Sequence, residues 1–170
     1  MGRPKTEETA AKVASRNALK RNLLWERPGF LVRRLHQIHS AMFFEACRKF
    51  GVTPLQYSLL SILRDQPGLD QSGLGWELGI DRSNAFDVVQ RLKRAGLITL
   101  RADDHDRRRK ITALTSAGSA LLARLDPVAL RAHDNLLVSL SPRERKLLMT
   151  MLQKVLAAKD DVGRDVPTGI

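Results

Sequence analysis

One stretch of sequence decides the fold: LDQSGLGWELGIDRSNAFDVVQRLKRAGLI, residues 69–98. Its first half predicts a short helix that ends at Gly79, and its second half predicts a helix from about residue 82 to residue 95, ended by Gly96. The apolar positions of the first helix are Leu74, Trp76 and Leu78. The apolar stripe of the second is Phe86, Val89 and Leu92, with Val88 beside it. Two short helices joined by a glycine-containing turn, the second amphipathic and basic, are the layout of a helix-turn-helix.

A β-hairpin is predicted directly after these helices. Residues 97–101 and 110–114 are rich in apolar and β-branched residues, as strands are. Between them lies the charged loop ADDHDRRR, residues 102–109. A two-stranded hairpin with a basic tip that follows a helix-turn-helix is a wing, so this region predicts a winged helix-turn-helix.

Four further helices are predicted, which makes the fold class mainly α. They cover residues 28–50, 54–65, 115 to about 140, and a last helix that opens at residue 141. Pro127 lies inside the third of these helices and should kink or break it. The helices near the two ends of the chain carry more apolar surface than one small lobe could cover, which predicts a helical dimerisation layer.

The charge distribution points to a polyanionic partner. The 170 residues carry a net charge of +11. Residues 80–114 contain nine Lys or Arg and five acidic residues, a net charge of +4, whereas residues 52–79 contain one basic and three acidic residues. Aromatic residues make up only 5% of the chain, which argues against a stacking surface for single-stranded nucleic acid.

Several classes of protein are disfavoured by what the sequence lacks. Cys47 is the only cysteine, so the chain can form no internal disulfide, and no apolar run approaches the length of a membrane span. The N-terminus lacks the apolar middle of a secretory signal, so we expect a cytoplasmic location and no membrane partner. No phosphate loop, nucleophile elbow or metal-ligand cluster is evident. We therefore expect no catalytic residue, no cofactor and no metal site.

Three short motifs occur in the order and spacing of one known family. They are Arg91-Leu92-Lys93-Arg94-Ala95-Gly96-Leu97-Ile98, Asp106-Arg107-Arg108, and Leu114-Thr115-Ser116-Ala117-Gly118, preceded by Asp81-Arg82-Ser83 at the start of a helix. In these motifs the chain resembles the multiple-antibiotic-resistance-regulator (MarR) family over roughly residues 28–158. The resemblance implies a homodimer held by the first, fifth and sixth helices. It also implies that a small-molecule or redox signal releases DNA.

The expected domain organisation follows from the elements and this resemblance. Residues 53–114 form the winged helix-turn-helix lobe, and residues 28–51 and 115–158 supply the dimerisation helices. Residues 1–27 are expected to form a basic, flexible arm, with a docked helix as the alternative, and residues 159–170 a polar tail. Within the arm, Gly2-Arg3-Pro4-Lys5 resembles the core of an AT-hook, a minor-groove element.

Double-stranded DNA is the expected partner, with a palindromic operator that matches the dimer. On the second helix of the motif, the polar side away from the apolar stripe would meet base edges in the major groove. The helix residues expected at DNA are Arg82, Ser83, Asn84, Asp87, Gln90 and Arg91. Asp87 could accept a hydrogen bond from cytosine or hold an arginine. In the wing, Arg107, Arg108 and Arg109 suit a narrow minor groove, and the resemblance implies that Asp106 orients an arginine. A solvated polar face is the alternative reading.

An effector site is expected where the resembled family places it, between the first long helix and the DNA-binding lobe. The candidate residues are Trp25, Arg34, His36, His39, Phe43, Tyr57 and Arg64. Arginine and histidine beside aromatic rings would suit an anionic aromatic ligand, either an aromatic acid or, as the family's effectors suggest, an aromatic acyl-CoA. The alternative places His36 and His39 on a plain helix face or at the dimer interface. A metal is disfavoured because no further ligand adjoins the two histidines.

Two other functions stay open. Cys47 could make the protein a thiol redox-sensing regulator, although its place beside Phe43 and Phe50 predicts a buried and unreactive thiol. A winged helix can also serve as a protein-interaction module. The four consecutive cations at positions 107–110 favour DNA over that second role.

Overall fold

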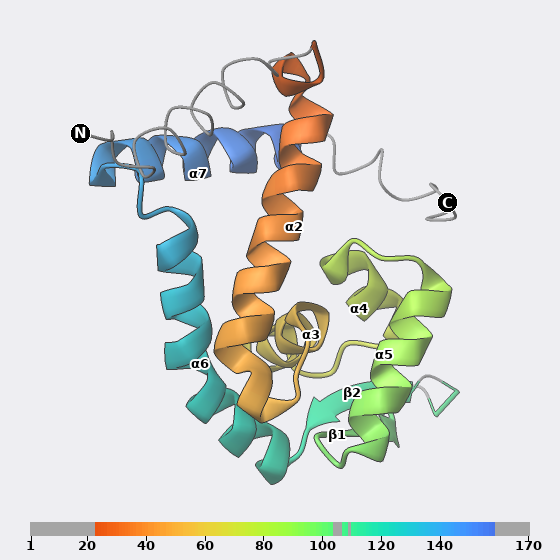
Figure 1. The fold of residues 1–170 in the computed structure, drawn as a ribbon. Helices are drawn as coiled ribbons and strands as arrows, with labels where there is room; N and C mark the ends of the chain where they lie inside the picture. The colour runs from red at the N-terminus through yellow and green to blue at the C-terminus, as the bar shows by residue number, and fades with distance from the viewer. Residues whose placement is uncertain (1–22, 104–106, 109, 159–170) are drawn as a thin grey trace, which may run out of the picture. The chain divides into compact units, whose positions relative to one another are not determined.

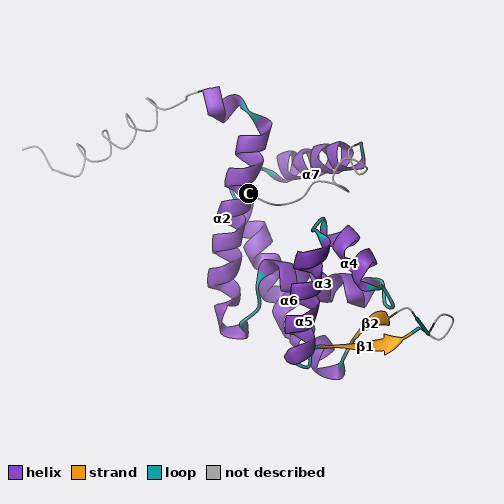
Figure 2. Ribbon diagram, turned by 90° about the vertical axis from the view of Figure 1, so that its right-hand side faces the viewer, coloured by secondary structure: helices purple, strands orange, loops and turns teal. Residues whose placement is uncertain are grey.

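The computed structural model describes residues 23–103, 107, 108 and 110–158, and it is built of helices with one small antiparallel sheet (Figures 1 and 2). The chain forms two compact units, residues 1–38 and residues 39–170. The residues predicted to form the AT-hook and the C-terminal tail lie outside the described residues, as does most of the N-terminal arm. The mainly α winged helix-turn-helix expected from the sequence is confirmed.

The first unit contains the short 3-10 helix η1 (Leu23–Glu26) and the N-terminal half of α2 (Pro28–Cys47). Trp25 of η1 packs edge-on against Phe30, with 5.4 Å between ring centroids, and the guanidinium of Arg33 lies 5.2 Å from the centre of the Phe30 ring. The apolar side chains of this half of α2 that remain exposed are Leu31, Val32, Leu35 and Ile38.

In the second unit, side-chain caps define where the helices begin. Helix α3 (Pro54–Asp65) starts with a capping box between Thr53 and Gln56, as the Thr53-Pro54 pair predicts. Asp70 caps α4 (Gln71–Leu78) and Asp81 caps α5 (Arg82–Arg94), each by accepting a backbone N–H three residues on. Gly79 adopts a left-handed conformation, with φ 64°, and so ends α4 as predicted.

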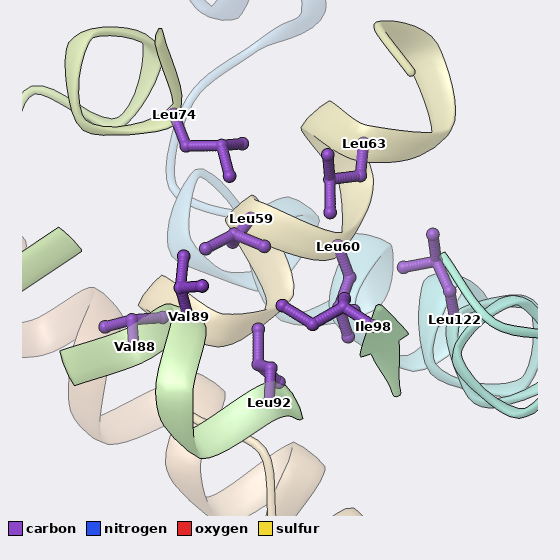
Figure 3. Packing of buried hydrophobic residues seen from close by; sticks show 9 residues of the cluster. All are labelled: Leu59, Leu60, Leu63, Leu74, Val88, Val89, Leu92, Ile98 and Leu122. Carbon is purple, nitrogen blue, oxygen red and sulfur yellow. The ribbon is translucent and has the colours of Figure 1, made fainter. Parts of the chain in front are cut away.

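The core of the winged-helix lobe forms where α3, α4, α5, the hairpin and α6 meet, and Figure 3 shows its side chains pointing toward one another. It contains the buried residues Leu59, Leu60, Leu63, Leu74, Val88, Val89, Leu92, Ile98 and Leu122. Two sequence predictions about this core were wrong. Phe86 and Trp76 are exposed rather than buried, because α5 turns Ala85 inward and α4 turns Leu74 and Gly75 inward.

The wing pairs β1 (Ile98–Ala102) with β2 (Lys110–Leu114) in antiparallel register, Ile98 opposite Leu114 and Ala102 opposite Lys110. The first strand begins one residue later than predicted, because the N–H of Leu97 bonds the carbonyl of Leu92 at the end of α5. The loop before α4 also supports the wing, since the N–H of Thr112 donates to the carbonyl of Leu69 at 2.8 Å. The hairpin is therefore tied to the helix-turn-helix at two places.

Helix α6 (Ser116–Leu136) is capped by Thr115 and passes through Pro127 without interruption. Of the kink or break predicted at Pro127, the break does not occur, and the predicted end near residue 140 is wrong. The proline removes one helical hydrogen bond, but Leu125 and Ala129 on either side of it are fully buried and hold the helix in place. Residues 137–139 form a turn, and α7 (Pro142–Ala157) follows with a capping box between Ser141 and Glu144.

A second cluster lies between the C-terminal half of α2 and α6. Helix α2 ends at Cys47, three residues before the predicted end, and continues as the 3-10 helix η2 (Arg48–Phe50) to Gly51. The buried members of this cluster are Phe43, Cys47, Val52, Leu125 and Ala129. Tyr57 of α3 packs against both clusters, so it belongs to the winged-helix lobe and to the α2–α6 layer.

Candidate functional site

Helix α5 presents a polar and cationic surface next to the wing. Its buried side consists of Ala85, Val88, Val89 and Leu92, spaced as one helical stripe. Of the residues predicted to contact DNA, Gln90 is half-buried and the others on this helix are exposed: Arg82, Ser83, Asn84, Asp87 and Arg91. The sequence placed these side chains away from a stripe of Phe86, Val89 and Leu92, whereas the buried stripe contains Ala85 and Val88 in place of Phe86.

Asn84 is held by the residue that caps its own helix. One carboxylate oxygen of Asp81 accepts the backbone N–H of Asn84 at 2.9 Å, and the other accepts its side-chain amide at 2.6 Å. One N–H of the amide is therefore engaged, and its second N–H and the side-chain carbonyl oxygen are the groups left to face a partner. Bidentate pairing of Asn84 with adenine would use these two groups.

The wing carries exposed cations on both sides of its tip. Arg107 and Arg108 are exposed, as are Arg101 on β1 and Lys110 on β2. Asp106 and Arg109, both predicted at DNA, lie outside the described residues. Helix α5 and β1 are joined by a short turn at Gly96, whose carbonyl accepts a hydrogen bond of 2.7 Å from the hydroxyl of Thr115, the residue that follows β2. This turn fixes the wing beside the C-terminal end of the cationic helix.

An aromatic cluster brings together three of the predicted effector residues. The ring of Phe43 lies 5.4 Å from that of Tyr57 and 6.1 Å from that of His39. His133 of α6 completes the cluster, 4.9 Å from His39 and 6.5 Å from Tyr57, measured between ring centroids. The sequence analysis missed His133. The helical spacing of Leu125, Ala129 and Ala132 indicates the side of α6 near which His133 lies, but not the residues that it meets there.

The other predicted effector residues have different surroundings. The guanidinium of Arg64 pairs with Asp126 of α6 and with Asp65, and Tyr57 donates to Asp126 at 3.0 Å. The polar ends of Arg64 and Tyr57 are thus held by a carboxylate that the sequence analysis did not single out. Trp25, Arg34 and His36 belong to the first unit, where all three are exposed and Arg34 donates to Gln37 at 3.2 Å.

Two ionisable groups at this end of the second unit have raised pKa values. Burial is the largest cause of the raised pKa of Tyr57, followed by its hydrogen bond to the Asp126 carboxylate and by that charge. Burial alone raises the pKa of the Cys47 thiol, which is fully inaccessible. The predicted burial of Cys47 beside Phe43 is confirmed, and it disfavours a reactive thiolate.

Neither a metal-ligand cluster nor a membrane-spanning helix occurs among the described residues. Among the described residues, no three or more His, Cys, Asp or Glu side chains come together as a metal site would require. Within the same residues, no helix combines the length and apolarity that crossing a bilayer demands. The fold and the exposed basic surface therefore define a winged helix-turn-helix protein of the DNA-binding class.

Comparison with known proteins gives the family. Residues 50–109 match the family model described as MarR family. The chain is 31% identical over 138 residues to the HTH-type transcriptional repressor NicR of Pseudomonas putida, covering 81% of this chain and 87% of NicR. The chain belongs to the MarR family, and it is a transcription regulator of that family.

Two solved structures resemble it closely. One concerns the regulation of DNA binding of Bordetella bronchiseptica BpsR by 6-hydroxynicotinic acid; it is 31% identical, has a TM-score of 0.72, and covers 76% of this chain and 93% of BpsR. The other is the transcriptional repressor CouR bound to a 23-mer DNA duplex, at 32% identity and a TM-score of 0.74, covering 81% of this chain and 97% of CouR.

Proposed function

We propose that this protein is a repressor that binds a pseudo-palindromic operator in duplex DNA and leaves it when a small anionic aromatic ligand binds. The observation that carries the proposal is the arrangement of α5, which buries one apolar stripe and turns a polar, cationic side outward beside an arginine-bearing wing. NicR and CouR are both described as repressors, and CouR was solved on a DNA duplex. In this reading the chain performs no catalysis.

The proposed contacts divide by chemistry. Ser83, Gln90 and Arg91 on the outer side of α5 would reach base edges in the major groove, with Arg91 suited to guanine. Arg107, Arg108 and Arg109 of the wing would enter the minor groove, with Asp106 orienting one of them. Arg82, Asn84 and Asp87 complete the proposed surface, and Asn84 would offer its carbonyl oxygen and the amide N–H that Asp81 does not hold.

A homodimer is the proposed assembly, and α7 supplies the main support for it. None of the residues of α7 is buried in the single chain. The exposed apolar side chains of α7 are Leu147, Met149, Met151, Val155 and Leu156. A patch of this size on an isolated chain is costly in water, and a second copy would cover it. We propose residues 53–114 as the DNA-binding lobe and residues 28–51 and 115–158 as the dimerisation helices.

The proposed effector is an aromatic acid or its coenzyme A thioester. The aromatic cluster of His39, Phe43, Tyr57 and His133 supplies ring faces and imidazoles at the junction of α2, α3 and α6. BpsR, whose DNA binding is regulated by 6-hydroxynicotinic acid, sets a precedent for a ligand of this class in the family. Arg64 is the further candidate within the second unit, and Trp25, Arg34 and His36 of the first unit stay candidates for effector binding on the sequence alone.

The test begins with duplexes selected by the protein from a random pool and measures binding by fluorescence anisotropy. Arg91→Ala should weaken binding to the selected duplex by on the order of 1–3 kcal/mol more than binding to random DNA. Arg107→Ala should weaken both to a similar degree and flatten the dependence on salt. A protein that binds no duplex, or binds with no salt dependence, would contradict the proposal.

The effector half is tested by titrating aromatic acids and their coenzyme A thioesters with and without the selected duplex. A hundredfold loss of DNA affinity requires the ligand to prefer the released form by about 2.7 kcal/mol, and the duplex must weaken ligand binding by the same factor. A ligand that binds equally well in both conditions is not the effector.

A further inference from the structure

Phe86 is the one exposed apolar side chain of α5, all of whose residues the structure describes. Its exposed fraction is 49%, whereas its neighbour Ala85 is 1% exposed. The other exposed residues of α5 are polar or charged: Arg82, Ser83, Asn84, Asp87, Arg91, Lys93 and Arg94. About half of the Phe86 side chain is thus left uncovered by the folded chain, and Phe86 is not among the residues packed against the core of the lobe.

The helical spacing puts Phe86 at the edge of the surface that would read bases. Residues three and four apart are neighbours on a helix surface, so Phe86 adjoins Ser83 on one turn and Gln90 on the next. By the same spacing Phe86 also adjoins Val89 of the buried stripe, which comprises Ala85, Val88, Val89 and Leu92. Phe86 therefore lies at the edge of the proposed base-reading surface, where that surface meets the buried stripe.

The charge around Phe86 decides which partner would cover it. Arg82 lies one turn before it and Lys93 two turns after it on the same side of the helix, and both are exposed. An apolar protein surface would have to desolvate these cations, whereas DNA would pair them with phosphates. Within the major groove, the apolar group available to a phenylalanine ring is the C5-methyl of thymine.

We propose that Phe86 determines sequence specificity by packing its ring against a thymine methyl group in each half-site of the operator. This proposal rests on the proposed function, since it needs α5 in the major groove. It specifies the base that Phe86 recognises, a thymine, and the group by which the thymine is recognised, its methyl carbon rather than a hydrogen-bonding atom.

The experiment replaces thymines of the selected duplex by deoxyuridine, which removes only the methyl group and keeps base pairing. Replacing the contacted thymine in one half-site should weaken binding of the wild-type protein by about fourfold, the equivalent of burying one methyl group, and replacing it in both half-sites by about fifteenfold. For Phe86→Ala the same replacement should have no effect on affinity. Phe86→Leu, which keeps an apolar side chain, should retain part of the sensitivity.

A matched control is Arg94→Ala, which removes an exposed side chain near the C-terminal end of the same helix and leaves Phe86 in place. It should leave the response to deoxyuridine intact, and thermal melting of all three variants verifies that they are folded. If the wild-type protein binds the selected duplex with the expected salt dependence but no thymine is coupled to Phe86, this proposal fails and the proposed function stands. If the wild-type protein binds no duplex, both fail together.

Discussion

The hydroxyl of Tyr57 donates a hydrogen bond of 3.0 Å to the carboxylate of Asp126, across 69 residues of sequence. The bond joins α3 of the winged-helix lobe to α6, and the same carboxylate also receives the guanidinium of Arg64. Tyr57 in turn packs on Phe43 of α2. Tyr57 thus connects the DNA-binding lobe with α6 and with the C-terminal half of α2.

Tyr57 is the only tyrosine in the chain, so its ionisation can be followed by the absorbance of tyrosinate. We expect it to titrate above the ordinary value of 10.0 in the native protein, because burial and the Asp126 carboxylate both disfavour the phenolate. Asp126→Asn should lower this pKa but leave it above that of the denatured protein, since burial is the larger cause. A native pKa equal to that in guanidinium would contradict the observed contacts.

The same shift predicts how stability depends on alkaline pH. Because the pKa of Tyr57 is raised on folding, the neutral tyrosine stabilises the folded protein in full at pH values below the unfolded pKa, which is near 10.0. This contribution to the free energy of unfolding is lost as the pH rises through the pKa of the folded state. Tyr57→Phe should therefore flatten the fall in the free energy of unfolding above the unfolded pKa, measured by urea denaturation. An unchanged slope would show that other groups dominate the alkaline loss.

Gly118 marks a close approach between α6 and the end of the helix-turn-helix. A Cβ atom at this position would overlap the carbonyl oxygen of Leu97, a backbone atom that cannot rotate away. Gly118→Ala should therefore destabilise the protein by several kcal/mol or displace the wing, as measured by thermal melting and by duplex binding. Gly29→Ala is the control, because a Cβ there has no atom within 4 Å, and it should leave the melting temperature nearly unchanged.

Cys47 is the only cysteine and is fully buried between α2 and α6. A thiol reagent should modify it slowly in the native protein and rapidly in denaturant, because burial both shields the sulfur and raises its pKa. DNA binding should be unaffected by mild peroxide. Rapid native labelling with loss of DNA binding would instead support the redox-sensing alternative.

The exposed apolar side of α7 predicts a charge-sensitive dimer. Val155→Glu places a carboxylate on that side and should shift the mass measured by light scattering toward the monomer. Gln153→Glu introduces the same charge elsewhere on the helix, at an exposed polar position, and should leave the dimer intact. A wild-type protein that is monomeric at micromolar concentration would rule out the proposed assembly.

Local signals in the sequence determined most of the elements. Thr53-Pro54, Asp81 and Ser141-Pro142 each begin a helix where predicted, because a side chain that caps its own helix needs no distant partner. Gly79 ends α4 for a similar reason, since its left-handed backbone is a local requirement. The helix-turn-helix, the wing and the positions of their cations followed from such signals.

The sequence could not show which residues are buried where two sets of residues on one helix have equally suitable helical spacing. The spacing of α5 fits a stripe through Phe86 as well as one through Ala85, and only the packing of α3 and α4 turned Ala85 inward and left Phe86 exposed. Asp126 and His133 meet Tyr57 because α6 returns alongside α3, a long-range contact that no local pattern encodes. The sequence by itself determined most of the elements, their ends and their charge. The tertiary structure decided which side of each helix is buried and which distant groups meet. The reason is that burial depends on neighbours that only the fold brings together.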